Sequence, residues 1–299
     1  LAQFLEYLES GERDPEEIAF MEPQAGGACR AGNIYNLLQR VLYRMAEQGQ
    51  TEYAQIPVIS LNLMGEEKHT GFRITPGLLS GGIAAGCYGD LIMCLYQQVK
   101  PYEQNPGETD RIRSQVEKKL CESIRRHRNG RHTREKNYRY ACEVFSKVPV
   151  KPGKKKRVGI TGEIYMKYSK LGNDDIESFL LRQGMEPYSG GFVNYCLYLV
   201  DTERYKAEKY QHNPIMVKAC AFVLHRLCEA QKHLLTVIGE TDRFQTDLPF
   251  PELKEKVQGI LAEGCNTGDG WLIAAEVIQY VEKGCGLSLI HISEPTRLR

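Results

Sequence analysis

Residues 24–33 hold the side chains best suited to chemistry. Two glycines, Gly26 and Gly27, are followed by a cysteine and an arginine, Cys29 and Arg30. Glycine lets a backbone approach a ligand closely, and a cation or a helix N-terminus lowers the pKa of a nearby thiol. A thiolate there could ligate metal or an iron–sulfur cluster, or act as a nucleophile. On composition alone, a buried structural thiol is the favoured alternative.

Two other glycine turns, at residues 159–163 and 264–271, could bind an anion at the start of a helix. Glu163 and Asp269 in these turns could do acid–base work, with a helix cap or a surface carboxylate as the favoured alternative. Neither turn has the dinucleotide-binding pattern G-x-G-x-x-G, and the chain has no phosphate-binding Walker A sequence. Tight turns that let helices pack on a sheet are therefore the favoured interpretation.

The ten cysteines are scattered singly, without a C-x-x-C pair. This usage predicts reduced thiols and a cytoplasmic location rather than a disulfide scaffold or a zinc ribbon. Cys87 and Cys94 share one face of a predicted helix, where a free thiol packs as a small apolar side chain. His225 and His233 also share a helix face, but no third metal ligand lies near them in sequence.

The elements that must position these residues follow a strand–helix–strand order. An apolar run at 18–21 predicts a strand, spaced apolar residues at 34–45 predict a helix, and 56–61 predicts a second strand. Residues 74–127 have a helical pattern, and 158–162 open another strand that enters a glycine turn. We therefore expect an α/β fold of two Rossmann-like lobes with parallel sheets and a helical insertion.

Charge is unevenly distributed along the 299 residues. The net charge is only +1, yet residues 118–157 contain fifteen Lys and Arg against three Glu. This stretch could bind RNA or another anion, although a solvated helix and linker is the favoured interpretation, because aromatic residues are few there. No uninterrupted apolar run reaches the roughly 20 residues of a membrane span, so we expect no membrane segment.

The two ends of the chain predict a fragment. Residues 287–297, LSLIHISEPTR, match one reading frame of a widely used transposon-based sequencing adapter, and the first residue is Leu1 rather than Met. We therefore expect residues 286–299 to be an adapter-derived tail, with a genuine short strand at 287–292 as the alternative. Truncation at both ends is the corresponding expectation for the rest of the chain.

Six sets of segments, in order along residues 1–285, resemble the acyl-CoA dehydratase activase-related proteins. The later part of those proteins is similar to the iron–sulfur subunits of 2-hydroxyacyl-CoA dehydratases. The matching segments are FMEPQAGGACR (20–30), IPVISLN (56–62), YGDL (88–91), PYE with GETD (101–103 and 107–110), VGITGE (158–163) and NTGDGW (266–271).

The resemblance implies an oxygen-sensitive iron–sulfur cluster, [4Fe-4S] or related, in a cytoplasmic protein of an anaerobe. An ATP-hydrolysing activase, on lobes of the same or another chain, would supply a low-potential electron. Radical dehydration or reduction of an acyl-CoA, a lyase-type reaction, would follow. Cys29 corresponds to a cluster ligand in a pocket shaped by Gly26, Gly27 and Arg30, and no catalytic residue is assigned. The other ligands would lie outside this sequence, so we expect the fragment alone to be inactive.

The expected organisation has a first α/β lobe with its helical extension at 1–150, a second lobe at 151–285 and the tail at 286–299. Two alternative functions stay open. One is a non-catalytic electron-transfer or scaffold module of the same system. The other, less favoured, is an anion- or RNA-binding protein that uses the basic stretch at 118–157.

Overall fold

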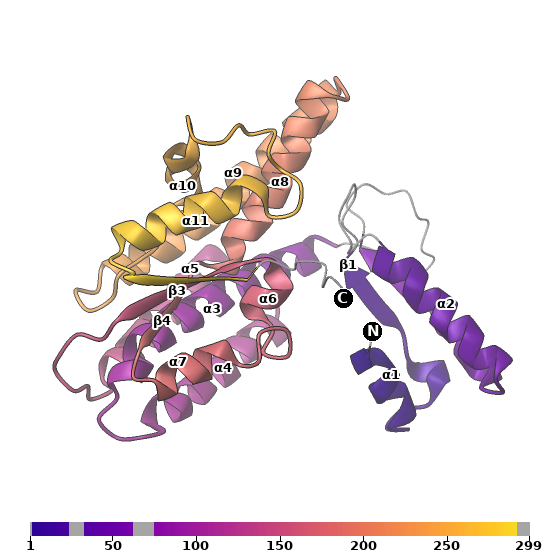
Figure 1. The fold of residues 1–299 in the computed structure, drawn as a ribbon, viewed down its shortest axis with the longest axis horizontal. Helices are drawn as coiled ribbons and strands as arrows, with labels where there is room; N and C mark the ends of the chain where they lie inside the picture. Colours follow the sequence, from indigo (N-terminus) through magenta and orange to yellow (C-terminus); the bar gives the residue numbers. More distant parts are fainter. Residues whose placement is uncertain (1, 24–32, 62–74, 292–299) are drawn as a thin grey trace, which may run out of the picture. The chain divides into compact units, whose positions relative to one another are not determined.

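A computed structural model describes residues 2–23, 33–61 and 75–291 of the chain. They belong to two compact units, Leu1–Ile74 (unit 1) and Thr75–Arg299 (unit 2). Figure 1 shows the helices and strands of both units, which are described separately below. Each unit has its own buried apolar core.

Unit 1 is a small strand–helix–strand unit. Strands β1 (Phe20–Pro23) and β2 (Val58–Leu61) pair in parallel, with Phe20 opposite Val58. Helix α2 (Ile34–Glu47) connects them and buries Leu38 and Leu42, as its apolar spacing predicts. Helix α1 (Ala2–Glu9) and two short 3-10 turns, Pro15–Glu17 and Thr51–Gln55, complete the unit. The expected parallel strand–helix–strand arrangement is therefore confirmed here.

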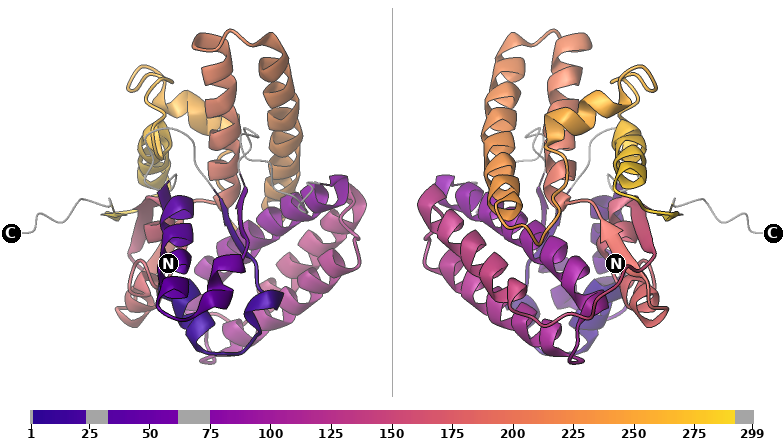
Figure 2. Two further views of the ribbon diagram at one scale, coloured as in Figure 1. Left: turned by 90° about the vertical axis from the view of Figure 1, so that its right-hand side faces the viewer. Right: turned by 90° about the vertical axis from the view of Figure 1, so that its left-hand side faces the viewer.

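Unit 2 is mostly helical. Of the predicted helical residues 74–127, those from Pro76 to Arg125 contain two helices interrupted near Pro101, as expected, and a short 3-10 turn, Lys100–Tyr102, lies between them. The remaining helices include a long hairpin, α8 and α9, which lie side by side in Figure 2. The helices are α3 (Pro76–Val99), α4 (Glu108–Arg125), α5 (Arg131–Ser146), α6 (Ile164–Tyr168), α7 (Ile176–Arg182), α8 (Phe192–Lys209), α9 (Pro214–Gly239), α10 (Phe250–Val257) and α11 (Gly270–Glu282).

The sheet of unit 2 has three parallel strands in the order β4-β3-β5. The central strand, β3 (Arg157–Gly162), is predicted by its apolar residues. The edge strand β4 (Glu186–Ser189) is not, because Pro187 interrupts its short apolar pattern and cannot donate a ladder hydrogen bond. Helix α11 packs on β3, where Gly159 leaves room for the ring of Tyr280.

The core of unit 2 crosses the expected boundary near residue 150. Leu91 of α3, Phe145 of α5 and Leu234 of α9 belong to one buried cluster. Helices α3, α4 and α5 pack against each other, and α3 and α5 also pack against α9, so the two sides of residue 150 share one core. The boundary between the two compact units along the chain therefore lies at Ile74–Thr75 rather than at the linker 151–156.

Helix α3 with its following 3-10 turn, Pro76–Tyr102, is long and apolar enough to span a membrane by length and composition. The sequence predicts no membrane segment, because glycines and single polar residues interrupt the apolar run. Length and composition alone do not show that this helix spans a membrane, so the expectation stays a prediction. The second half of α3 packs into the core of unit 2 through Leu91, Leu95 and Val99, while 28% of the most apolar window of the segment is buried.

The segment assigned to an adapter-derived tail forms a strand in its first part. Strand β5 (Leu287–His291) pairs in parallel with β3, with Val158 opposite Leu287. This is the alternative that the sequence left open. An apolar segment of any origin can pair with an open sheet edge, so the adapter interpretation stays a prediction. Residues 292–299 lie outside the described residues.

Candidate functional site

The predicted cluster-binding segment lies between β1 and α2. Gly26, Gly27, Cys29 and Arg30 themselves lie outside the described residues. The structure describes the elements on either side of this segment. Strand β1 ends at Pro23 and pairs in parallel with β2, and helix α2 begins at Ile34. The segment therefore leaves the carboxyl end of a parallel strand and leads to a helix, which is where α/β proteins place ligands.

The described residues hold no metal-binding group of cysteines. Residues 2–23, 33–61 and 75–291 contain no group of three or more His, Cys, Asp or Glu that could hold a metal ion. Burial raises the pKa of Cys87, Cys142 and Cys228 to about 11, which keeps these thiols protonated at neutral pH. Because a thiolate is the metal ligand, this burial disfavours metal binding and favours a packing role for these thiols. The core position predicted for Cys87 is confirmed, since its side chain is buried.

A second group of polar residues gathers at the carboxyl end of β4, where Gly190 and Gly191 lead into α8. Asp90 of α3 accepts hydrogen bonds from the backbone N–H groups of Phe192 (2.7 Å) and Val193 (2.9 Å). Asp247 accepts from the N–H of Gly191 (3.2 Å) and from the Tyr188 hydroxyl. Two carboxylates from distant segments therefore satisfy the free N–H groups at the start of α8.

Burial controls the protonation of these carboxyls. It raises the pKa of Asp90 to about 7, although the two backbone N–H donors oppose the rise, and neighbouring Asp247 raises the pKa further. Burial raises the pKa of Asp247 as well. Desolvation disfavours the charged form of each carboxyl, and two adjacent negative charges disfavour each other. Asp90 therefore changes charge near neutral pH.

A buried ion pair lies beside this group. The ammonium of Lys167 in α6 is 2.5 Å from Glu276 Oε1 in α11, and both side chains are almost fully buried. The hydroxyl of Thr161, at the end of β3, donates to the other oxygen of Glu276 at 2.7 Å. Gly190 allows this approach, because a Cβ atom there would lie 2.9 Å from Glu276. Glu276 is thus held from two sides, and Lys167 is held by Glu276.

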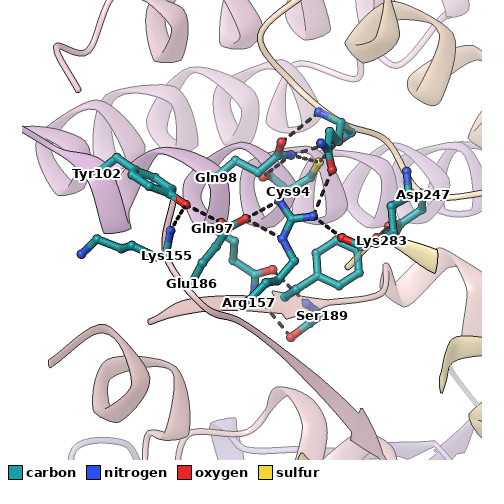
Figure 3. A network of polar contacts seen from close by, with 12 residues as sticks. Cys94, Gln97, Gln98, Tyr102, Lys155, Arg157, Glu186, Ser189, Asp247 and Lys283 are labelled. Atoms are coloured by element: carbon teal, nitrogen blue, oxygen red, sulfur yellow. Dashed lines mark hydrogen bonds and ion pairs between the residues drawn. The ribbon is translucent and has the colours of Figure 1, made fainter. Parts of the chain in front are cut away.

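A cavity of about 260 Å³ adjoins Lys167. Its volume is close to the lower limit of small-molecule sites. Gln97 of α3 connects the cavity wall to the sheet: its side-chain oxygen accepts from the N–H of Ser189 (3.0 Å), and its amide nitrogen donates to Glu177 (3.0 Å). Figure 3 shows Gln97 and Ser189 together with the Arg157–Glu186 ion pair, which joins the first residues of β3 and β4.

The sequence missed this group because its members are far apart along the chain. Lys167 and Glu276 are separated by 109 residues, and Asp90 in α3 and Gly191 at the N-cap of α8 lie on opposite sides of the expected lobe boundary. The local signal is the strand that ends in Thr161 and a glycine, which predicts a tight turn. Which helices bring a cation or a carboxylate to that turn depends on tertiary packing.

The two carboxylates proposed for acid–base work are helix-start residues. Glu163 and Asp269 occupy the N-cap positions of α6 and α11, without a side-chain capping hydrogen bond. Burial, and then the charge of Glu163, raises the pKa of Asp269 to about 6. Gly270 follows with a positive φ, and a Cβ there would lie 2.2 Å from the Cys265 carbonyl oxygen. This turn is therefore a close backbone contact that lets α11 pack.

Part of the basic stretch is neutralised within the molecule. Arg139 pairs with Glu135 (3.0 Å) and also with Glu240, and Lys119 lies over the ring of Tyr140. Further ion pairs join Arg126 to Glu122, Lys147 to Glu143 and Arg157 to Glu186. Such contacts are typical of a solvated helical surface and lower the charge that a polyanion would meet.

Comparisons with family models, curated proteins and solved structures give no match to this chain. The resemblance to the acyl-CoA dehydratase activase-related proteins therefore depends on the quoted sequence segments. The cluster, the substrate class and the partner lobes stay predictions.

Proposed function

We propose that the chain belongs to an iron–sulfur component of an ATP-dependent system that dehydrates or reduces a CoA thioester. Cys29 would be one cluster ligand, and Gly26, Gly27 and Arg30 would form the loop around it. The observation that supports this assignment is the placement of the Cys29 segment between a parallel strand and a helix, β1 and α2. The proposed iron–sulfur and CoA-thioester chemistry depends on the resemblance of the quoted sequence segments to the acyl-CoA dehydratase activase-related proteins.

The organisation of the whole protein is part of the proposal. The parallel sheets of units 1 and 2 would be the centres of two Rossmann-like lobes in a cytoplasmic protein. The ATP-hydrolysing activase lobes would be supplied by the same or another chain. These lobes would deliver a low-potential electron, which the cluster, when bound, would pass to the acyl-CoA substrate.

The described residues alone do not fit a cluster. An iron–sulfur cluster takes four thiolates as a rule, and the described cysteines form no such group. Burial also keeps Cys87, Cys142 and Cys228 protonated, as their raised pKa values indicate. Cys29 would therefore share the cluster with ligands from other segments, and the 299-residue chain alone would not catalyse the reaction.

The test is a substitution of Cys29 in the complete protein. Cys29→Ser, reconstituted anaerobically with iron and sulfide, should lose bound iron and visible absorbance, because serine does not replace a thiolate ligand. The matched control is Cys121→Ser, which changes an exposed thiol on α4 and should keep both signals. Equal iron content and equal spectra in the two variants would overturn the assignment of Cys29.

Turnover separates the catalytic proposal from its first alternative. The complete protein, supplied with its activase, ATP and an acyl-CoA, should consume substrate in a Cys29-dependent manner. A non-catalytic electron relay or scaffold would bind a cluster at Cys29 but show no substrate-dependent turnover.

A further inference from the structure

The start of α3, the end of α4 and the turn into α5 lie together at one end of these three helices. The helices pack against one another. A Cβ atom at Gly81 of α3 would lie 3.6 Å from Asn129 Nδ2 in the turn and 4.0 Å from Ile124 Cγ2 of α4. Residues 76–82 and 125–134 therefore share one surface, which we call the basic end.

The basic end carries positive charge without counter-ions. Residues 125–134 contain five arginines and no acidic residue. Arg126 pairs with Glu122 of α4 at 2.5 Å. Three of the other arginines are exposed and form no ion pair with the described part of the chain: Arg125, Arg128 and Arg131. In contrast to the later part of α5, this surface keeps its charge for an external anion.

Hydrogen bonds fix the turn that carries these arginines. The Ser123 hydroxyl donates to the Arg128 carbonyl (3.0 Å), and the Arg128 N–H donates to the Ser123 carbonyl (2.9 Å). The side-chain amide of Asn137 in α5 donates to the hydroxyls of Ser123 (3.1 Å) and of Tyr88 in α3 (2.7 Å). The turn is thus tied to α3 and α5, and its arginines are presented from a fixed backbone.

Exposed apolar side chains lie at the same end. Leu78 and Leu79, near the start of α3, are 49% and 52% exposed, and Pro76 is exposed as well. The long apolar segment that begins at Pro76 has 28% of its most apolar window buried. The basic end therefore combines apolar surface with unpaired guanidinium groups.

We propose that the basic end binds the surface of a membrane that contains anionic lipids, with Leu78 and Leu79 at the acyl chains and the unpaired arginines at the phosphate groups. Guanidinium groups bind phosphate oxygens in a bidentate manner. Peripheral binding to a bilayer gains strength from buried apolar area and from attraction to anionic lipids together. The inference is independent of the proposed function, because this surface belongs to unit 2 and Cys29 to unit 1.

The proposed contact is with the membrane surface and is not a span. The second half of α3 buries Leu91, Leu95 and Val99 in the core of unit 2. In the middle of the helix, Asp90 accepts hydrogen bonds from two backbone N–H groups at the start of α8. Moving this half of α3 into lipid would expose the core, so only the first turns of the helix are available to a bilayer.

Nucleic acid is the competing anionic partner. Its phosphate groups would meet the same arginines, but residues 76–82 and 125–134 contain no Phe, Tyr or Trp on which single-stranded bases could stack. Contacts to a phosphate backbone also leave Leu78 and Leu79 without a role, whereas acyl chains remove them from water. The combination of side chains therefore favours lipid.

The first experiment measures co-sedimentation of the 299-residue chain with lipid vesicles. Vesicles of phosphatidylcholine with about one third phosphatidylglycerol should bind the chain at least about tenfold more tightly than vesicles of phosphatidylcholine alone. A short DNA duplex at the same phosphate concentration should not displace the chain from the anionic vesicles. No association with anionic vesicles, or displacement by the duplex, would overturn the proposal.

The apolar contact is tested by removing the two leucines. Leu78→Ser with Leu79→Ser should lower the affinity for anionic vesicles at least about tenfold, because less apolar area is buried in lipid. The matched control is Leu171→Ser with Leu261→Ser, which removes two exposed leucines elsewhere in unit 2 and should leave the affinity unchanged. Equal affinities of the two double variants would contradict insertion of the start of α3.

The role of the arginines is tested at constant net charge. Arg128→Gln with Arg131→Gln should lower the affinity for anionic vesicles at least about tenfold. The control, Lys151→Gln with Lys154→Gln, removes the same charge from exposed residues near the other end of α3, where the Lys151 N–H donates to the Tyr102 carbonyl (2.7 Å). The control should bind like the original chain. An equal loss in both variants would show that net charge, and not the basic end, controls binding.

Discussion

At the scale of single residues, the absence of a side chain at certain glycines allows the sheet and helix α11 of unit 2 to pack closely. Gly159 lies on the central strand, where a Cβ atom would be 2.4 Å from the Tyr280 ring. The Tyr280 hydroxyl in turn accepts from the N–H of Gly190 (2.7 Å) and donates to the Ile160 carbonyl (3.0 Å). Tyr280 cannot move away without losing buried hydrogen bonds.

We therefore expect Gly159→Ala to destabilise unit 2 by about 1–3 kcal/mol, as overpacking of a core does. Urea unfolding followed by tryptophan fluorescence measures the effect. The control is Gly82→Ala, where a Cβ meets open space on a helix and should be neutral or slightly stabilising. Equal stabilities of the two variants would contradict the close contact between β3 and α11.

Asp90 makes stability depend on pH. Its pKa is raised from 3.8 to about 7, mainly by burial, so the folded state binds this proton more tightly than the unfolded state. Its contribution to stability is complete below about pH 4 and is lost as the pH rises through 7, by up to about 1.4 kcal/mol for each pH unit. Asp90→Asn should reduce this loss of unfolding free energy as the pH rises.

The measurement is the free energy of unfolding between pH 4 and pH 8. Asp247 and Asp269, whose pKa values are also raised, keep part of the pH dependence in the variant. Asp242→Asn changes an exposed carboxylate and serves as the control. A pH profile of Asp90→Asn that matches that of the control would show that Asp90 does not titrate in this range.

At the scale of elements, the three strands of the unit 2 sheet differ in the contacts that hold them in place. Strand β3 contributes Val158 and Ile160 to a buried cluster with Leu180 of α7. Strand β4 is fixed through Ser189, whose N–H donates to Gln97, and through Glu186, which pairs with Arg157. Strand β5 pairs only with β3 in the described sheet and has an edge position.

We expect a chain that ends at Gly286 to keep unit 2 folded. The buried clusters of this unit lie between Ala84 and Ala275, so removing residues 287–299 leaves them intact. The open edge of β3 should then make the shortened chain associate more strongly, because unpaired N–H and C=O groups accept another strand. Circular dichroism and sedimentation at several concentrations test both statements. Unfolding of the shortened chain would show that β5 is essential.

At the scale of the whole molecule, the two units should unfold separately. The core of unit 1 is small, with Leu38, Leu42 and Tyr53 among its members, whereas that of unit 2 spans most of its helices. A smaller core gives less stabilisation. Trp271, the one tryptophan of the chain, is buried in unit 2 and reports on that unit alone.

We therefore expect two steps in urea unfolding followed by circular dichroism, with tryptophan fluorescence changing in the later step. A chain that begins at Thr75 should lose the early step and keep the fluorescence transition. Coincident transitions by both probes in the full chain would indicate instead that the two units unfold as one.

The sequence by itself determined helices α2, α3 and α4 and strands β1, β2 and β3, because their signals are local. Apolar spacing gave the buried face of α2. The sequence pattern also predicted the strand before Cys29 and the helix after it, β1 and α2. The iron–sulfur cluster at Cys29 is still a prediction.

Only the tertiary structure decided which residues meet. Lys167 reaches Glu276 across 109 residues, and Asp90 reaches the start of α8 across more than a hundred. The boundary between the units and the edge strand β4 were likewise set by packing. The physical reason is that periodicity specifies which face of a helix is apolar, whereas the choice of its partner depends on how all the faces are buried together.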